Sequence, residues 1–484
     1  MNTLTIKLKQ HTPLIHFQHD QDGATLRASE VKPKLDKYII KHEFHDNFDE
    51  CKKYLVGYNP KKLKELKSKW DAGIRALDYK MSIEASGREE YMIGSIVGSS
   101  EPDGKPKEVI ILTTTPFFAQ EQENRKIVTT RKEGDKKVST FHENEWVKIP
   151  KKGLKWSDVT LEMFSIRPSL IEIIRNHVVC FFICTNFGTR SDKGFGSFTV
   201  ESVNGSSEDS NFKEEIYEKA FKTNYAFCYK RDFSLEEDYS LSTIFREIKS
   251  DYQKLKSGVN MGKYYKKSLL FCYAIDRMNQ NPRWEKRHFK QEMKDQLGFT
   301  TTLDQQGNKV YDVKRELKIN EKRANSNPIF DSKGNQKWEE KPGEFDYKFL
   351  RAVLGLADHY EFTLQGKKGK ITYKLNDKAI VSVNNDSIKR FQSPLFIKVI
   401  DNVVYLLGNE LVKEKDSILN QKFDFDYIIK KKVGRETVSE PLSIKDDELS
   451  TPTEFSLSKF IHYAICEAKE SDRLHYEIVF NSKV

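Results

Sequence analysis

The chain has 484 residues, more than one compact core accommodates, so we expect two or three domains. Hydrophobic residues make up 37%, and 82 basic against 72 acidic residues give a net charge of +10, which fits a folded protein with a polyanionic partner. Six scattered cysteines without a CxxC pair argue against a disulfide framework or a zinc finger, and the apolar runs are too short to span a bilayer. We therefore expect a cytoplasmic protein with no membrane partner.

The first part of the chain predicts one domain over residues 1–205. Polar and apolar residues alternate at 4–9, which predicts a strand, and a helix is expected to begin near Pro33. Pro168 opens another helix, which Gly188 ends. Further strands are expected at 81–85, 109–113, 160–166 and 198–203, and the lysine-dense stretch 52–69 predicts an inserted helix or loop. This β-α-β-β-α-β order is typical of a ferredoxin-like domain.

After a polar linker, residues 212–484 predict a second domain. Asp401-Asn402 separates two apolar runs and indicates a tight hairpin. Helices are expected at 241–255, 269–278, 347–356 and 455–468, the last capped by Thr453, and strands at 360–364, 371–375 and 476–480. We interpret this half as a degenerate copy of the first. The predicted fold class is α+β, with two ferredoxin-like (RRM-like) domains that carry helical and loop insertions.

The most informative segment is the glycine-rich loop at 186–198. Its glycines, Gly188, Gly194 and Gly196, allow positive φ and a close approach of the backbone to a bulky anion. Exposed amides beside Arg190 and Lys193 suit phosphate oxygens, and Phe195 offers a face for base stacking. The RNA-binding residues predicted in this loop are Gly188, Thr189, Arg190, Ser191, Lys193, Gly194, Phe195 and Gly196. A glycine-rich hairpin without a ligand is the competing interpretation.

The loop resembles the hallmark of the RAMP superfamily of CRISPR-associated proteins, G-x-R-x-x-[RK]-G-F-G-S, at each fixed position. Arg27 resembles the arginine that these proteins carry before their first helix. Residues 393–399, after Arg390, are similar to a segment of the end-capping RAMP subunit of type III-B effector complexes. The stretches 52–69 and 298–344 have no counterpart in this resemblance.

The resemblance implies a non-catalytic capping subunit of an RNA-guided ribonucleoprotein. Its partners would be guide RNA near the 3′ end, target RNA and other RAMP subunits, with no cofactor or metal. Beyond the loop, the RNA-binding candidates are Arg27, Lys32, Lys34 and Lys37 around the first helix and, as weaker candidates, Lys389, Arg390 and Lys398 in the second half.

Two other functions remain open. Histidine suits acid–base catalysis, so His16 or His19 could serve a metal-independent endoribonuclease that processes guide precursors. The His16-x-x-His19 spacing also permits metal ligation, although ordinary polar roles are favoured for these histidines and for His11. A structural adaptor that contacts only protein subunits is the other alternative. The sequence contains no Walker loop, no G-x-S-x-G elbow and no H-E-x-x-H motif.

Overall fold

The computed structural model divides into two compact units, each made of several segments of the chain. Unit 1 comprises residues 1–249, 396–407 and 476–480. It therefore extends beyond residue 205, the expected end of the first domain, and includes two short segments from the second half of the chain. Unit 2 comprises residues 250–395, 408–475 and 481–484. The structure describes residues 2–16, 25–93, 111–112, 121–133, 136–149, 151–206, 214–234, 240–260, 265–278, 282–283, 285–297, 302–303, 309–310, 318–319, 328–330, 336–338, 346–356, 358–368, 371–373, 378–388, 390–411, 417–433, 436–444 and 447–482.

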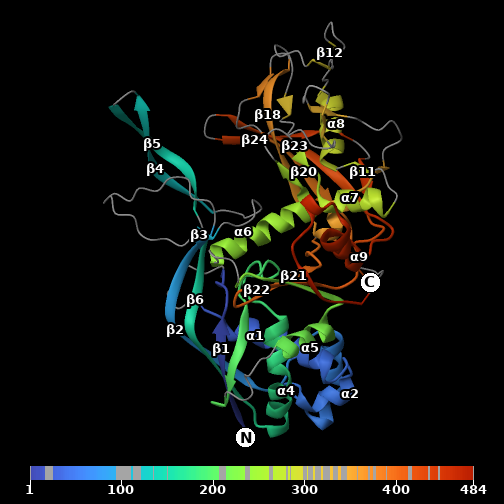
Figure 1. The fold of residues 1–484 in the computed structure, drawn as a ribbon. Helices are drawn as coiled ribbons and strands as arrows, with labels where there is room; N and C mark the ends of the chain where they lie inside the picture. The colour runs from blue at the N-terminus through green and yellow to red at the C-terminus, as the bar shows by residue number, and fades with distance from the viewer. Residues whose placement is uncertain are drawn as a thin grey trace. The chain divides into compact units, whose positions relative to one another are not determined.

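The first sheet of unit 1 is arranged around β1 (Thr3–Gln10), which buries every second side chain, as its alternation predicts. This strand lies antiparallel between β6 (Lys151–Phe164) and β7 (Phe198–Val203). Beyond β6 lie β2 (Lys80–Ile93), also antiparallel, and the short parallel strand β3 (Ile111–Leu112). The sheet order is β3-β2-β6-β1-β7, and Figure 1 shows β2 and β6 as long adjacent strands.

Two helices share one hydrophobic core with this sheet. α1 (Ala28–His42) and α4 (Pro168–Cys184) contribute buried residues at helical spacing, and β1 contributes its buried row, Leu4, Ile6 and Leu8. The expected start of the first helix near Pro33 is wrong, because the helix begins at Ala28 and Pro33 lies inside it. Pro33 lacks the N–H that would bond to Ser29, but both residues are exposed, so water reaches the freed carbonyl.

A second sheet of unit 1 combines distant segments of the chain. Its order is β21-β22-β8-β26, from β8 (Phe227–Asp232), β21 (Leu395–Ile400), β22 (Val403–Gly408) and β26 (Glu477–Asn481). The predicted hairpin at Asp401-Asn402 joins β21 to β22, and Asp401 adopts a positive φ of 50°. α5 (Glu214–Asn224) packs Ala220 and Phe221 against this sheet.

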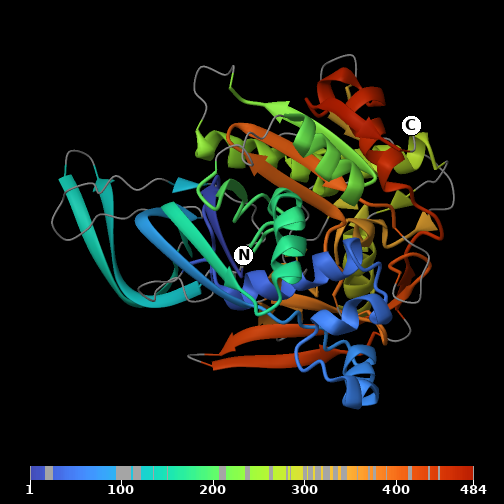
Figure 2. The same ribbon diagram turned by 90° about the horizontal axis from the view of Figure 1, so that it is seen from below.

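The lysine-dense stretch of unit 1 is helical. It contains α2 (Phe48–Cys51), a 3-10 turn at Lys52–Tyr54, a second at Pro60–Lys62, and α3 (Leu63–Asp71). Leu66 and Trp70 of α3 are buried in the core that α1 and α4 share with the sheet. A two-stranded ribbon of β4 (Glu121–Glu133) and β5 (Lys136–Ile149) is seen at the left of Figure 2.

Unit 2 contains its own antiparallel sheet, drawn from yellow to red in Figure 1. Its main strands, in the order β18-β20-β23-β24, are β18 (His359–Lys368), β20 (Lys378–Asn384), β23 (Lys422–Val433) and β24 (Glu436–Leu442). Phe289, Phe349 and Phe425 form an aromatic cluster, with ring centroids 4.6 Å and 5.8 Å from Phe425. The helices of unit 2 are α7 (Leu269–Asp276), α8 (Glu285–Leu297) and α9 (Leu457–His462), whereas residues 241–249 of α6 (Leu241–Tyr252) belong to unit 1.

Short elements complete unit 2. They are β9 (Val259–Asn260), β10 (Tyr265–Lys266), β11 (Pro282–Arg283), β12 (Thr302–Leu303), β13 (Lys309–Val310), β14 (Lys318–Ile319), β15 (Pro328–Phe330), β16 (Gln336–Trp338), β17 (Asp346–Tyr347), β19 (Ile371–Tyr373) and β25 (Glu448–Ser450). Instead of the helix expected at 347–356, a 3-10 turn spans Leu350–Leu354, and Ser456 rather than Thr453 caps α9. Across the described residues, no helix has the length and apolar character needed to cross a bilayer.

Candidate nucleic-acid interface

The glycine-rich loop connects α4 to β7 through a backbone path that needs its glycines. Gly188, Gly194 and Gly196 have φ values of +76°, +89° and +63°, in the left-handed region that side chains rarely adopt. A Cβ atom on Gly196 would lie 2.0 Å from the carbonyl oxygen of Phe187. The loop is therefore a tightly folded turn in which Gly196 allows two backbone segments to touch.

Three amides of this turn bond within the protein. Gly188 N–H donates to Glu30 Oε1 at 2.7 Å, Thr189 N–H to the Ile15 carbonyl at 2.8 Å, and Gly196 N–H to the Pro13 carbonyl at 2.9 Å. These three amides hold the loop against α1 and the segment that follows β1. The expectation that they face phosphate oxygens is not met in this structure, because each already has a protein acceptor.

Phe195 is a core residue. Its side chain is 1% exposed, and its ring stacks on Phe245 of α6 with centroids 4.1 Å apart. The prediction that Phe195 offers a face to a base is contradicted in this structure, because Phe245 occupies that face. Gly194 beside it is also buried, and a Cβ there would lie 3.1 Å from Val399. This half of the loop belongs to the interior of unit 1.

Strand β21 holds the loop through buried polar contacts. Asn186 Nδ2 donates to the carbonyls of Ser191 and Ile397 at 2.7 and 2.8 Å, and Ser197 Oγ donates to the Val399 carbonyl at 2.6 Å. Ile397 N–H in turn donates to the Asp192 carbonyl at 3.1 Å. Apart from the local bond to Ser191, these bonds join residues about two hundred positions apart, so the loop has one defined conformation.

Lys398 completes this connection. Its side chain is 0% exposed, and Nζ donates to the carbonyls of Phe182, Thr185 and Phe198 at 2.7, 3.0 and 2.9 Å. The ammonium group therefore satisfies carbonyls at the C-terminal end of α4, where the helix dipole favours a cation. Burial lowers the pKa of Lys398 to about 7. The weaker expectation that Lys398 contacts RNA is contradicted in this structure, because its side chain is buried. Its position within an apolar strand was the available signal for a structural role.

The tip of the loop carries two cations, Arg190 and Lys193, and the ammonium nitrogen of Lys193 is itself buried. Ser191, Arg190 and Lys193 are all partly exposed, and Arg190 has a positive φ of 62°. Lys193 Nζ lies 3.0 Å from a carboxylate oxygen of Asp192. Burial lowers the pKa of Arg190 to about 9, an effect that Asp192 opposes, so the guanidinium stays charged at neutral pH. Partial burial of both cations strengthens their attraction to an approaching anion.

The first turn of α1 lies beside the loop, because Glu30 accepts the Gly188 amide. Arg27 is the N-cap residue of this helix and is partly exposed. Lys34 Nζ donates to Glu30 Oε1 at 2.9 Å and to the Asn186 carbonyl at 3.2 Å. The structure thus brings Arg27 and Lys34 to the same end of the helix that the loop contacts.

The other basic candidates lie elsewhere. Lys32 bonds to Asp36 and to the Leu77 carbonyl, both at 2.8 Å, and lies over the Tyr79 ring, so it serves the packing of α1. Lys37 is exposed on α1. Arg390 is exposed in unit 2, and Lys389 lies outside the described residues.

Histidine chemistry has limited support in the described parts of the chain. His11 is buried, accepts a hydrogen bond from the Asp401 amide at Nδ1, and donates from Nε2 to Thr199 Oγ1 at 2.7 Å. Burial lowers the pKa of His11, which fits a neutral structural imidazole. His16 is partly exposed, His19 lies outside the described residues, and no cluster of three metal-ligating side chains occurs among the residues described.

Family models match almost the whole chain. The model described as the Cmr1 N-terminal domain matches residues 1–259, and that described as the Cmr1 C-terminal domain matches residues 265–482. These matches confirm the prediction of a RAMP protein of the CRISPR type III effector class. The chain belongs to the Cmr1 family.

Solved structures show distant similarity. The apo crystal structure of Cmr1 from Pyrococcus furiosus is 8% identical, with a TM-score of 0.23 over 52% of this chain and 72% of that one. A cryo-EM structure of the type III-B Cmr-beta bound to cognate target RNA contains a chain 9% identical, with a TM-score of 0.32 over 84% of this chain and 94% of that one. A search of curated proteins found no significant match.

Proposed function

We propose that the chain is a non-catalytic, RNA-binding capping subunit of a type III-B CRISPR ribonucleoprotein, with guide RNA near its 3′ end, target RNA and other RAMP subunits as partners. The loop tip and the first turn of α1 would contact the RNA backbone. The observation that carries this proposal is the placement of Arg190 and Lys193 at the partly exposed tip of a loop that buried contacts hold in one conformation. A rigid pair of cations suits phosphate contacts, which position RNA without reading its sequence.

The strand order of unit 1 supports a ferredoxin-like scaffold for this interface. β1, α1, β2, β6, α4 and β7 follow one another as β-α-β-β-α-β, and the four strands lie in the order β2-β6-β1-β7. The later elements β8, α6, β21, β22, α9 and β26 repeat that chain order, and their sheet, β21-β22-β8-β26, repeats the spatial order. We infer two ferredoxin-like sheets, the second interrupted by the long insertions that form unit 2.

The double substitution Arg190→Ala with Lys193→Ala tests the loop tip. We expect weaker binding of single-stranded RNA and a salt dependence whose slope falls by about 1.4, because each lost phosphate contact removes roughly 0.7. Fluorescence anisotropy at several salt concentrations measures both, and an unchanged thermal midpoint confirms folding. Lys219→Ala with Lys222→Ala, two exposed lysines of α5, is the control of equal charge. Equal affinity of the loop variant and the parent at every salt concentration would exclude this loop as an RNA contact.

The same RNA samples separate this proposal from a metal-independent endoribonuclease. We expect no site-specific cleavage of repeat RNA in EDTA. Cleavage that His16→Ala abolishes would favour the enzyme, and the absence of RNA crosslinks in the assembled particle would favour a protein-only adaptor.

A further inference from the structure

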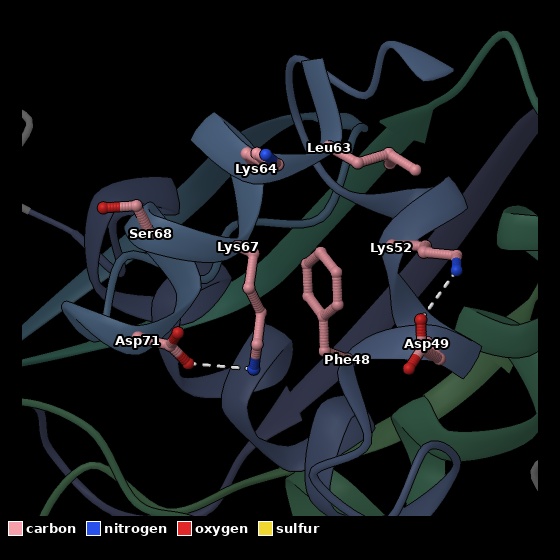
Figure 3. A pocket seen from close by; sticks show the side chains of 8 residues that line it. All are labelled: Phe48, Asp49, Lys52, Leu63, Lys64, Lys67, Ser68 and Asp71. Atoms are coloured by element: carbon pink, nitrogen blue, oxygen red, sulfur yellow. Dashed lines mark hydrogen bonds and ion pairs between the residues drawn. The ribbon is translucent and has the colours of Figure 1, made fainter. Parts of the chain in front are cut away.

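The lysine-dense insertion of unit 1 forms an open, shallow pocket of about 520 Å³ between α2 and α3. Figure 3 shows the Phe48 ring standing between the side chains of Lys52 and Lys67. The lining residues are Phe48, Asp49, Lys52, Leu63, Lys64, Lys67, Ser68 and Asp71. An aromatic ring is therefore flanked by cations in a hollow outside the glycine-rich loop.

The floor of this pocket is held from beneath. Phe48 meets Trp70 edge to face, with ring centroids 5.7 Å apart, and Trp70 is 3% exposed. Leu66, on the same helix as Trp70, and Cys51, at the end of α2, are also buried in the core of unit 1. The two short helices thus have fixed inner faces, and Phe48 needs little reordering to receive a ligand.

The cations at the rim are held only by weak contacts. Lys52 and Lys67 pair with Asp49 and Asp71 at 2.7 and 2.9 Å, and both carboxylates are mostly exposed to solvent. Exposed pairs of this kind contribute roughly 0–1 kcal/mol, so a phosphate can replace either carboxylate. Lys67 Nζ also lies 5.1 Å from the centroid of the Phe48 ring, and its exposed side chain can leave the ring face as a base arrives.

Residues 52–69 carry seven lysines against one glutamate, and the pocket itself is lined by three lysines and two aspartates, which leaves a net charge of +1. We propose that this pocket binds one nucleotide of single-stranded RNA, with the base on Phe48 and its phosphate between Lys52, Lys64 and Lys67. The aromatic floor distinguishes RNA from an acidic peptide, because every base presents a π-face that stacks on such a ring. The pocket is a second RNA contact, made of residues that the loop tip does not share.

Paired charge variants of the full chain test this site. Lys64→Ala with Lys67→Ala removes two cations of the pocket, whereas Lys61→Ala with Lys69→Ala removes two cations of the same segment outside it. With labelled oligouridine, we expect the pocket variant to bind several-fold more weakly and its salt slope to fall by about 1.4. The control should change both quantities much less. Equal losses in the two variants would overturn the proposal, since they would indicate only a diffuse positive field.

Phe48→Leu tests the aromatic contact and keeps an apolar side chain against Trp70. We expect binding to weaken by about fivefold or more, because stacking on an aromatic ring is worth roughly 1–3 kcal/mol per base. Unchanged affinity, with the thermal midpoint preserved, would overturn the stacked base. A poly-glutamate peptide that competes fully with the RNA in the parent but not in the lysine variant would instead identify an acidic protein partner.

Crosslinking separates this site from the loop. Photocrosslinks of oligouridine to the peptide that contains Phe48, retained when Arg190 and Lys193 are replaced, would support the pocket even if the loop proposal fails. Crosslinks confined to the loop peptide would overturn the pocket and leave the loop proposal intact.

Discussion

Lys398 shows how one buried ammonium group joins its own strand to the end of α4 and the start of β7, about two hundred residues earlier in the sequence. Replacing it by methionine keeps the length of the side chain but leaves three carbonyls without their donor, at about 1–3 kcal/mol for each group that stays unsatisfied. We expect Lys398→Met to lower the urea midpoint clearly. Lys37→Met, at an exposed position on α1, is the matched control and should change stability by less than about 0.5 kcal/mol.

The pH dependence of this difference follows from the lowered pKa of Lys398. In the unfolded chain a lysine keeps its proton up to about pH 10.4, whereas burial lowers the folded pKa to about 7. Between these values the unfolded state binds more protons, so the contribution of Lys398 to stability rises with pH, by at most about 1.4 kcal/mol per unit. Urea unfolding of the parent and of Lys398→Met between pH 7 and 9 measures this contribution as the difference between their free energies of unfolding. A constant difference would mean that the three carbonyls keep the amine protonated.

The environment of individual side chains was predicted less well from the sequence than the helices and strands were. Phe195 stands between two glycines, a setting that indicated exposure, but Phe245 covers its ring. Lys398 lies in an apolar strand, where a lysine normally marks the solvent face, and only the folded chain shows which carbonyls surround it. In both cases the residues that bury the side chain are far away in the sequence, so local sequence patterns cannot predict the contact.

At the scale of elements, the glycine-rich loop depends on residues without side chains. We expect Gly196→Ala to lower the free energy of unfolding by roughly 2–5 kcal/mol, because a left-handed φ is strained and the new Cβ would meet the Phe187 carbonyl at 2.0 Å. Gly205→Ala is the control, since its φ of +76° is similar but nothing lies within 4 Å of its Cβ. It should cost only about 1–2 kcal/mol. Equal urea midpoints for the two variants would contradict the close contact at Gly196.

Elements with strong periodicity were predicted well. The alternation of β1, the apolar face of α4 and the Asp401-Asn402 turn each specify local structure through side-chain spacing or turn chemistry. The start of α1 was misplaced, because Pro33 is a frequent first-turn residue and its tolerance inside an exposed helix face depends on solvent access. For the candidate site, the tight turn at the glycines was predicted correctly, but the amides of Gly188, Thr189 and Gly196 bond within the protein, and RNA binding by the loop stays a prediction.

At the scale of the whole molecule, the sequence predicted two consecutive halves, whereas the structure has two discontinuous units. Strand β8 follows β7 closely in the chain, but its neighbours in the sheet are β22 and β26, from the last hundred residues. Hydrophobic patterns identify such strands and leave their pairing open, because any apolar strand of similar length could form the same hydrogen bonds. The insertions that form unit 2 separate the strands of this second sheet in the sequence, so their pairing could not be predicted from it.

This discontinuity predicts that residues 1–259, the extent of the N-terminal family match, do not form a stable fragment. Without β21, β22 and β26, strand β8 has two open edges, and Asn186 and Ser197 lose their partners on β21. We expect the fragment to be protease-sensitive and to unfold without a cooperative transition, as measured by limited proteolysis and near-ultraviolet circular dichroism. Adding residues 260–484 as a separate chain should restore protection, because the missing strands can pair in trans. A fragment that unfolds cooperatively by itself would show that the first sheet and its helices are sufficient, and that the contacts from β21 only adjust the loop.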